Sequence, residues 1–175
     1  IVVVNRDAGA FKSEGVDALI AHIETAFGNE KRITDIHTVR GSEINPVIEA
    51  AAKNSDIKTI IAAGGDGTIS SAASACWKHK KQLGVIPGGT MNLFARSIGM
   101  PLNIFDSVSV LVDGTESTSD IGTANGRLFL HQYSVGMQPS LVRKRSRIGY
   151  GSRWGKIYAG AKAVLGLLAR TPRFD

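Results

Sequence analysis

Two glycine-rich loops carry the residues of this chain that could do chemistry, and the first is Gly64-Gly65-Asp66-Gly67-Thr68. It directly follows the apolar run 59–63, which predicts a buried parallel strand that ends in a tight loop. Glycines let the backbone approach a phosphate closely, and the segment 69–79 can form a helix whose N-terminal dipole favours an anion. The loop therefore indicates a site for phosphate groups.

Asp66 does not suit a bare phosphate site, because its carboxylate would repel the phosphates. The residue becomes useful if Mg²⁺ lies between them, or if the carboxylate accepts a proton from an attacking hydroxyl. Phosphoryl transfer from a nucleotide is therefore the first hypothesis. The alternative is a glycine-rich turn in which Asp66 is only the N-cap of the following helix.

The second loop, Pro87-Gly88-Gly89-Thr90-Met91-Asn92, follows another short apolar strand at 83–86. Thr90 and Asn92 supply a hydroxyl and a carboxamide that could bind a nucleotide. Loops at the ends of successive parallel strands face one crevice, where ligands usually bind. Neither loop has the P-loop pattern or the dinucleotide-binding fingerprint.

The remaining pattern alternates short apolar strands with amphipathic helices. Strands are expected at 1–5, 33–39, 57–63 and 83–86, and helices at 13–27, 43–53, 68–79, 91–98 and 103–112. Such alternation predicts an α/β fold, a three-layer αβα, Rossmann-like parallel sheet. After the composition change at 113–114, strands at 120–125 and 127–135 predict a hairpin with a type I′ turn at Asn125-Gly126.

Composition and charge restrict the class of protein. The chain has 175 residues, 43% of them apolar, and its one cysteine, Cys76, argues against a disulfide framework. Residues 121–174 contain ten Lys or Arg and no Asp or Glu. The basic cluster Arg143, Lys144, Arg145 and Arg147 precedes Tyr150, Trp154 and an amphipathic segment at 157–168.

This basic cluster suits an anionic phospholipid surface. A solvated basic face, and a helix that packs on its own domain, are the alternatives. Nucleic acid is not an expected partner, because no recognised nucleic-acid-binding module accompanies the charge.

Taken in order, these segments resemble the diacylglycerol kinase catalytic domain, whose superfamily includes sphingosine kinases and bacterial lipid kinases. The resemblance rests on both glycine loops together with three further segments: Asn5-Arg6-Asp7-Ala8-Gly9-Ala10, Ser119-Asp120-Ile121-Gly122 and Asn125-Gly126-Arg127-Leu128-Phe129. Departures occur at Arg6, where the family usually has Pro, at Ser70, where many relatives have Asn, and at Leu93, where Asp is frequent.

The resemblance implies an ATP-dependent lipid kinase that transfers the γ-phosphoryl group to the hydroxyl of diacylglycerol or a related lipid at a membrane surface. It implies ATP and Mg²⁺ as cofactors. The residues that would bind the nucleotide are Thr38, Gly64, Gly65, Asp66, Gly67, Thr68, Ile69, Ser70, Thr90 and Asn92. Asp66 would be catalytic, either as a base or through Mg²⁺, and Asp120 would add a second carboxylate for the metal.

The resemblance also divides the chain into an α/β nucleotide-binding catalytic domain at 1–115 and the incomplete beginning of a β-sandwich-type second domain at 116–175. The absent initiator Met and the apparent strand start at 171–175 favour a fragment of a longer protein. A cytoplasmic protein with peripheral membrane association is expected, and a homodimer is left open.

Two other functions are left open by the residues. A kinase that acts on NAD shares the Gly-Gly-Asp-Gly loop, and a non-catalytic nucleotide-binding or membrane-docking module would keep both loops without turnover. The identity of the lipid and the choice between a base and a metal ligand at Asp66 are also open.

Overall fold

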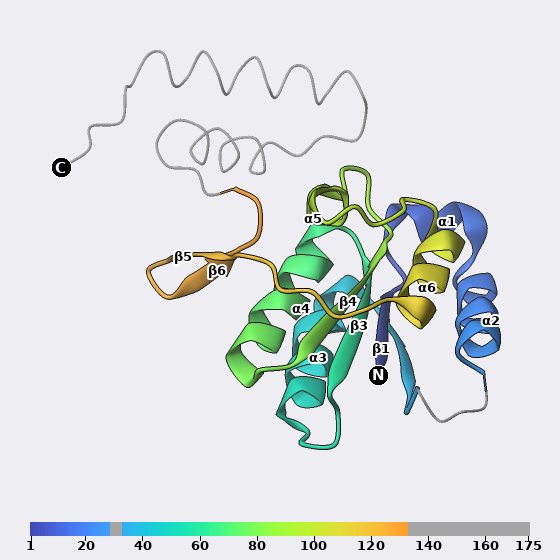
Figure 1. The fold of residues 1–175 in the computed structure, drawn as a ribbon. Helices are drawn as coiled ribbons and strands as arrows, with labels where there is room; N and C mark the ends of the chain where they lie inside the picture. Colours follow the sequence, from blue (N-terminus) through green and yellow to red (C-terminus); the bar gives the residue numbers. More distant parts are fainter. Residues whose placement is uncertain (29–32, 133–175) are drawn as a thin grey trace, which may run out of the picture. The chain divides into compact units, whose positions relative to one another are not determined.

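A four-stranded parallel sheet lies at the centre of the structure, a computed structural model that describes residues 1–28 and 33–132 (Figure 1). The strand order is β2-β1-β3-β4. The strands are β1 (Val2–Asn5), β2 (Ile36–Val39), β3 (Thr59–Gly64) and β4 (Gln82–Pro87). Residues 1–131 form one compact unit around this sheet.

Strand β1 pairs with β2 on one side and with β3 on the other, and this pairing places the ends of the three strands together. Val2 lies opposite Ile36 on one side and Ile61 on the other. The chain leaves β1 toward β2 and later leaves β3 toward β4 in the opposite direction, so the order reverses between β1 and β3. At such a switch point the loops diverge and leave a crevice beyond the carboxyl ends of the strands.

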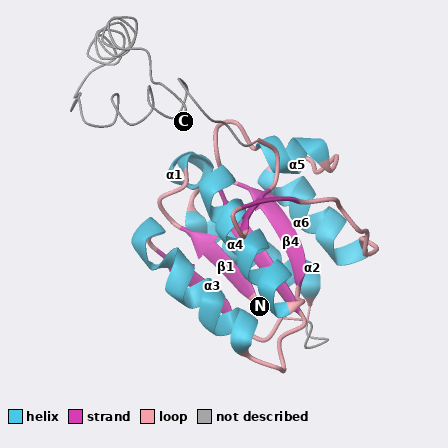
Figure 2. Ribbon diagram, turned by 90° about the vertical axis from the view of Figure 1, so that its left-hand side faces the viewer, coloured by secondary structure: helices cyan, strands magenta, loops and turns pink. Residues whose placement is uncertain are grey.

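Helices cover both faces of the sheet, as Figure 2 shows. On one face α3 (Ile44–Lys53), α4 (Asp66–His79) and α5 (Leu93–Ser97) pack on Val3, Ile60, Ala62 and Val85. On the other face α1 (Gly9–Glu14), α2 (Val16–Phe27) and α6 (Ile104–Asp113) pack on Val2, Val4, Ile61, Ala63 and Ile86. Because successive strand residues point to opposite faces, apolar runs fill both layers, and the predicted three-layer αβα fold is confirmed.

The first helical region differs from the prediction of one helix at 13–27. The structure has α1 and α2 instead, and Gly15 between them has φ +83°. A helix cannot continue through that conformation, which glycine adopts without steric cost. Residues 9–12 were not part of any predicted helix, and Phe11 of α1 lies in the core together with Ala8.

Two further boundaries differ from the predicted ones. Strand β2 begins at Ile36 rather than at residue 33. The helix predicted from residue 43 is preceded by the 3₁₀ turn Gly41–Glu43, where the Arg40 N–H donates to Glu43 Oε2 at 2.9 Å. Helix α3 then begins at Ile44, and Pro46 lies in its first turn, where proline is tolerated.

The hairpin is confirmed in its turn, and it is shorter than predicted. Strands β5 (Gly122–Ala124) and β6 (Arg127–Phe129) pair antiparallel. Asn125 and Gly126 have φ +49° and +73°, as a type I′ turn requires. Most of the predicted second domain, including the basic cluster, Tyr150, Trp154 and the segment 157–168, lies outside the described residues. The division at 115–116 therefore stays a prediction.

Candidate active site

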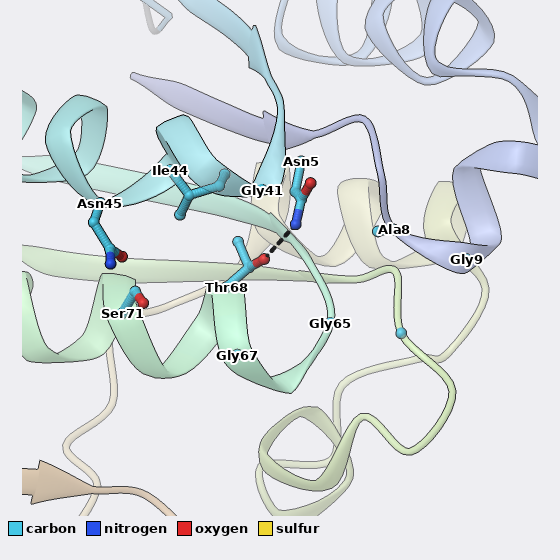
Figure 3. A pocket seen from close by; sticks show the side chains of 11 residues that line it. Asn5, Ala8, Gly9, Gly41, Ile44, Asn45, Gly65, Gly67, Thr68 and Ser71 are labelled. Carbon is cyan, nitrogen blue, oxygen red and sulfur yellow. Dashed lines mark hydrogen bonds between the residues drawn. The ribbon is translucent and has the colours of Figure 1, made fainter. Parts of the chain in front are cut away.

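A cavity of about 380 Å³ opens at the carboxyl edge of the sheet, beside the switch point (Figure 3). Loops that follow all four strands of the sheet contribute to its wall. The lining residues are Asn5, Ala8, Gly9, Gly41, Ile44, Asn45, Gly65, Gly67, Thr68, Ser71 and Gly89. No charged side chain occurs among these described lining residues.

The first turn of α4 provides backbone hydrogen-bond donors to the cavity. Gly65 is the N-cap of this helix, and the first N–H to bond back within the loop is that of Ile69, which donates to Gly65 O at 3.1 Å. The N–H groups of Asp66, Gly67 and Thr68 come before that point, where a helix leaves its donors without intrahelical partners. Together with the helix dipole, these donors suit an anionic ligand.

The glycines of the first loop are required by close contacts, and none of them has a positive φ. Gly65 has φ −81°, and only Gly15, Gly28, Gly99 and Gly126 have positive φ among the described glycines. A Cβ at Gly64 would lie 2.6 Å from Thr68 Oγ1, so glycine there makes room for the Thr68 side chain. Neither Gly65 nor Gly67 therefore needs glycine for its backbone conformation.

The two glycine loops touch each other through their backbones. A Cβ on Gly89 would lie 2.6 Å from Gly65 Cα, which is closer than real Cβ contacts come. The Gly88 N–H donates to Gly64 O at 2.8 Å, and the Ala10 N–H donates to Gly88 O at 3.1 Å. This contact builds one continuous wall from segments that follow β1, β3 and β4.

Asp66 joins the two loops through its carboxylate. Oδ2 accepts the Asn92 N–H at 3.0 Å, and Oδ1 accepts the Leu93 N–H at 2.6 Å. Asp66 is the first residue of α4 and Gly65 its N-cap, so the alternative in which Asp66 caps its own helix was wrong. The carboxylate serves the start of α5 instead and does not line the cavity.

Asn92 shapes the second loop with its side chain. Its Oδ1 accepts the Gly89 N–H and its Nδ2 donates to Gly89 O, both at 2.9 Å. The residue is buried and has φ +49°, a conformation that asparagine tolerates better than most residues. Thr90 is exposed, and neither Thr90 nor Asn92 lines the cavity, which Gly89 reaches instead.

The other predicted nucleotide-binding residues occupy varied positions. Thr38 is an exposed residue of β2 opposite Val4, and the cavity is lined by Gly41, three residues further along. Ile69 is buried in the core, and Ser70 is half-buried on α4. Asp120 is exposed in the segment that precedes β5. Their roles toward a nucleotide or a metal stay predictions.

Eight of the eleven lining residues were not among the predicted site residues: Asn5, Ala8, Gly9, Gly41, Ile44, Asn45, Ser71 and Gly89. Of these residues, Asn5 could most readily have been predicted from the sequence, because it is a polar residue at the end of an apolar strand. Asn45 lies on the first turn of α3 and Ser71 on the second turn of α4, and nothing in the sequence shows that these two helices face each other.

Oxygen ligands for a metal are sparse around the cavity. Among residues 1–28 and 33–132 no group of three or more His, Cys, Asp or Glu side chains could hold a metal ion. Mg²⁺ that enters with a nucleotide needs only one or two carboxylates, since phosphates and water complete its shell. Each carboxylate oxygen of Asp66 retains a lone pair beyond the one that accepts a backbone N–H, and the role of Asp66 toward a metal stays a prediction.

Comparison with known proteins identifies the class. The model of the diacylglycerol kinase catalytic domain matches residues 1–124, so the chain belongs to this family. A diacylglycerol kinase of Bacillus subtilis (strain 168) is 39% identical over 101 residues, covering 56% of this chain and 33% of its own length. One of Staphylococcus aureus (strain JH9) is 32% identical over 139 residues, covering 74% of this chain and 41% of its own.

Solved structures agree on the fold. A crystal structure of a diacylglycerol kinase from Bacillus anthracis str. Sterne has a TM-score of 0.58 at 26% identity, covering 74% of this chain and 47% of that one. Another structure from this organism has a TM-score of 0.64 at 24% identity, covering 85% of this chain and 54% of that one, and it supports the fold alone. The chain thus spans less than half the length of the two curated relatives. Within the described residues, no helix has the length and apolarity to cross a membrane.

Proposed function

We propose that this chain provides the nucleotide-binding part of an ATP-dependent lipid kinase, which transfers the γ-phosphoryl group to a lipid hydroxyl. The cavity beside the first turn of α4 is the observation that carries the proposal. Its donors come from backbone N–H groups and from the Thr68 hydroxyl, as binding of a polyphosphate requires. The relatives named diacylglycerol kinase support diacylglycerol or a related lipid as the acceptor.

Phosphoryl transfer depends mainly on positioning and on neutralisation of charge. Gly65 and Gly67 admit the phosphates to the backbone, and the packing of Gly65 on Gly89 holds the facing wall in place. None of the described lining residues is charged, and in this proposal a divalent cation offsets the charge of the triphosphate. When bound, Mg²⁺ supplies this neutralisation.

Asp66 has two roles in this proposal. Its carboxylate anchors the second loop through the Asn92 and Leu93 N–H groups, and its remaining lone pairs are available to Mg²⁺ or to the proton of the acceptor hydroxyl. Asp120 is kept as a second carboxylate for the metal. The basic cluster Arg143, Lys144, Arg145 and Arg147 would attract the protein to anionic phospholipid, where a lipid acceptor resides.

The test is a transfer assay with γ-labelled ATP and Mg²⁺. Vesicles that contain diacylglycerol, a sphingoid base or other lipids with a free hydroxyl are compared with NAD as the acceptor. We expect label on one lipid class and none on NAD. Label on NAD alone would favour a nucleotide kinase, and ATP binding without label on any acceptor would favour a non-catalytic module.

A further inference from the structure

A chain of three hydrogen bonds runs along the rim of the cavity and crosses three strand ends. The Gly41 N–H donates to Asp7 Oδ2 at 2.9 Å, and the Asp7 N–H donates to Asn5 Oδ1 at 3.1 Å. Asn5 Nδ2 then donates to Thr68 Oγ1 at 2.9 Å, the contact drawn as a dashed line in Figure 3. The chain begins after β2, passes the end of β1 and finishes on the first turn of α4.

The direction of this chain is determined by chemistry. A backbone N–H can only donate, so the Asp7 N–H requires the oxygen of the Asn5 carboxamide to face it. The NH₂ group of Asn5 must then face Thr68, whose hydroxyl oxygen is left to accept. The orientation of the Asn5 side chain therefore follows from its backbone neighbour, and it determines the role of Thr68.

Thr68 consequently has a proton to give and no acceptor for it among the described residues. A threonine hydroxyl carries one O–H donor, and no hydrogen bond donated by Thr68 Oγ1 occurs in this part of the chain. The side chain is only 6% exposed, yet it lines the cavity. A buried donor without an acceptor is costly, so a ligand that offers an oxygen would satisfy it.

We propose that the Thr68 hydroxyl is a dedicated donor to an anionic oxygen of the bound ligand, and that Asn5 and Asp7 are positioning residues that impose this direction. The proposal rests on the proposed function, since the anionic oxygen would belong to the polyphosphate of ATP. Asn5 and Asp7 then act through Thr68 rather than by touching the ligand. The nucleoside part of the ligand gains nothing from the arrangement.

The experiment compares binding of ATP, inorganic tripolyphosphate and adenosine by calorimetry, in the presence of Mg²⁺. Thr68→Val removes the hydroxyl at nearly constant shape, and we expect it to weaken ATP and tripolyphosphate by about 10- to 100-fold, the usual value of a hydrogen bond to a charged group. Thr68→Ser, which keeps the hydroxyl, should bind nearly as the wild type does. Adenosine binding should not change.

Variants of Asn5 separate a positioning role from a merely structural one. In Asn5→Asp the carboxylate can only accept, so it takes the Thr68 proton away from the ligand and ATP binding should fall at least as far as in Thr68→Val. Asn103→Asp is the matched control for charge, because Asn103 caps α6 through its side-chain oxygen and aspartate caps equally well. In a double-mutant cycle, Asn5→Ala should cost little in the Thr68→Val background.

Three results would overturn the proposal. They are unchanged ATP binding in Thr68→Val, an equal loss of adenosine binding, and additive losses for Asn5→Ala and Thr68→Val. Melting curves identify folded variants, and Thr68→Ala replaces Thr68→Val if the latter does not fold. The experiment measures binding and not lipid transfer, so the proposal about Thr68 can hold even if the protein phosphorylates no lipid. A wild-type protein that binds neither ATP nor tripolyphosphate would overturn both this proposal and the proposed function.

Discussion

The carboxylate of Asp66 accepts the backbone N–H of Asn92 at 3.0 Å, although 26 residues separate the two in sequence. A second bond, from the Leu93 N–H at 2.6 Å, uses the other carboxylate oxygen. The aspartate of the first glycine loop thereby fixes the second loop, whose Gly89 lines the cavity. A loss of Asp66 should therefore affect loop geometry as well as chemistry.

Asp66→Asn is expected to reduce phosphoryl transfer by at least about 100-fold, the usual contribution of an acid–base or metal-binding carboxylate. The melting temperature should also fall, because a carboxamide can accept through only one of its two positions and leaves one backbone N–H without its charged partner. Activity and melting are measured together, with Asp106→Asn in the exposed first turn of α6 as the control. Near-normal turnover would contradict the proposed role of Asp66.

Substitution by alanine should have different effects at Gly89 and at Gly67. A Cβ at Gly89 would lie 2.6 Å from Gly65 Cα, so Gly89→Ala must push the loops apart and should destabilise the fold by about 1–3 kcal/mol. A Cβ at Gly67 meets no atom within 4 Å, and alanine suits a helix better than glycine does. Gly67→Ala should keep or raise the melting temperature while it weakens ATP binding.

Denaturant melts and ATP titrations of these two variants decide the matter. A Gly67→Ala protein that binds ATP as tightly as the wild type would show that phosphates do not approach this position. A Gly89→Ala protein of unchanged stability would contradict the inferred contact between the loops.

Glu49 should make the stability of the protein depend on pH in the acid range. Its carboxylate accepts from Lys78 Nζ at 2.7 Å and lies 3.0 Å from His79 Nε2, and these contacts lower its pKa to about 2. A lowered pKa contributes stability above the ordinary value of 4.5 and loses it as the pH falls toward 2. Glu49→Gln should melt below the wild type at pH 7, and the difference should shrink between pH 4.5 and 2. A gap that stays constant over this range would contradict the ion-pair assignment.

Cys76 should be nearly inert in the native protein. Burial raises the pKa of its thiol to about 11, so the thiolate is scarce at neutral pH. Alkylation should be slower than in the unfolded chain by on the order of 100-fold or more, because the thiolate is the reactive form. Reaction with iodoacetamide, followed by mass spectrometry with and without denaturant, measures the ratio. Equal rates in the two conditions would show that the α4 face opens readily.

The basic cluster Arg143, Lys144, Arg145 and Arg147 should contribute to binding of anionic vesicles. Each basic residue near such a surface contributes about 1 kcal/mol, so serine at all four positions should weaken binding visibly, and less so at high salt. Vesicle sedimentation at two salt concentrations is the measurement. A double variant, Arg143→Ser with Lys144→Ser, is compared with a control double variant, Lys58→Ser with Lys80→Ser. The control removes the same number of charges from exposed lysines outside the cluster. Equal co-sedimentation of wild type and fourfold variant at low salt would contradict the membrane role.

Local patterns in the sequence determined the elements and the chemistry of the first loop. The run 59–63 before Gly64 predicted a buried strand because apolar residues occur at both its odd and its even positions. Helices cover both faces of the sheet, which accounts for that pattern. Asn125-Gly126 predicted the type I′ turn because these residues tolerate positive φ. Such features depend on neighbours in sequence, so they can be derived without the fold.

Tertiary structure decided which residues meet at the carboxyl edge of the sheet. Asn5 reaches Thr68 across 63 positions because β1 and β3 are adjacent and in a register that places their ends together. The same strand order puts Gly41 rather than Thr38 at the cavity, and it brings Gly89 onto Gly65. Residue types allow each of these contacts, but only the pairing of distant strands selects among them. A parallel sheet gathers the ends of its strands at one edge, and the site exists only once that sheet has formed.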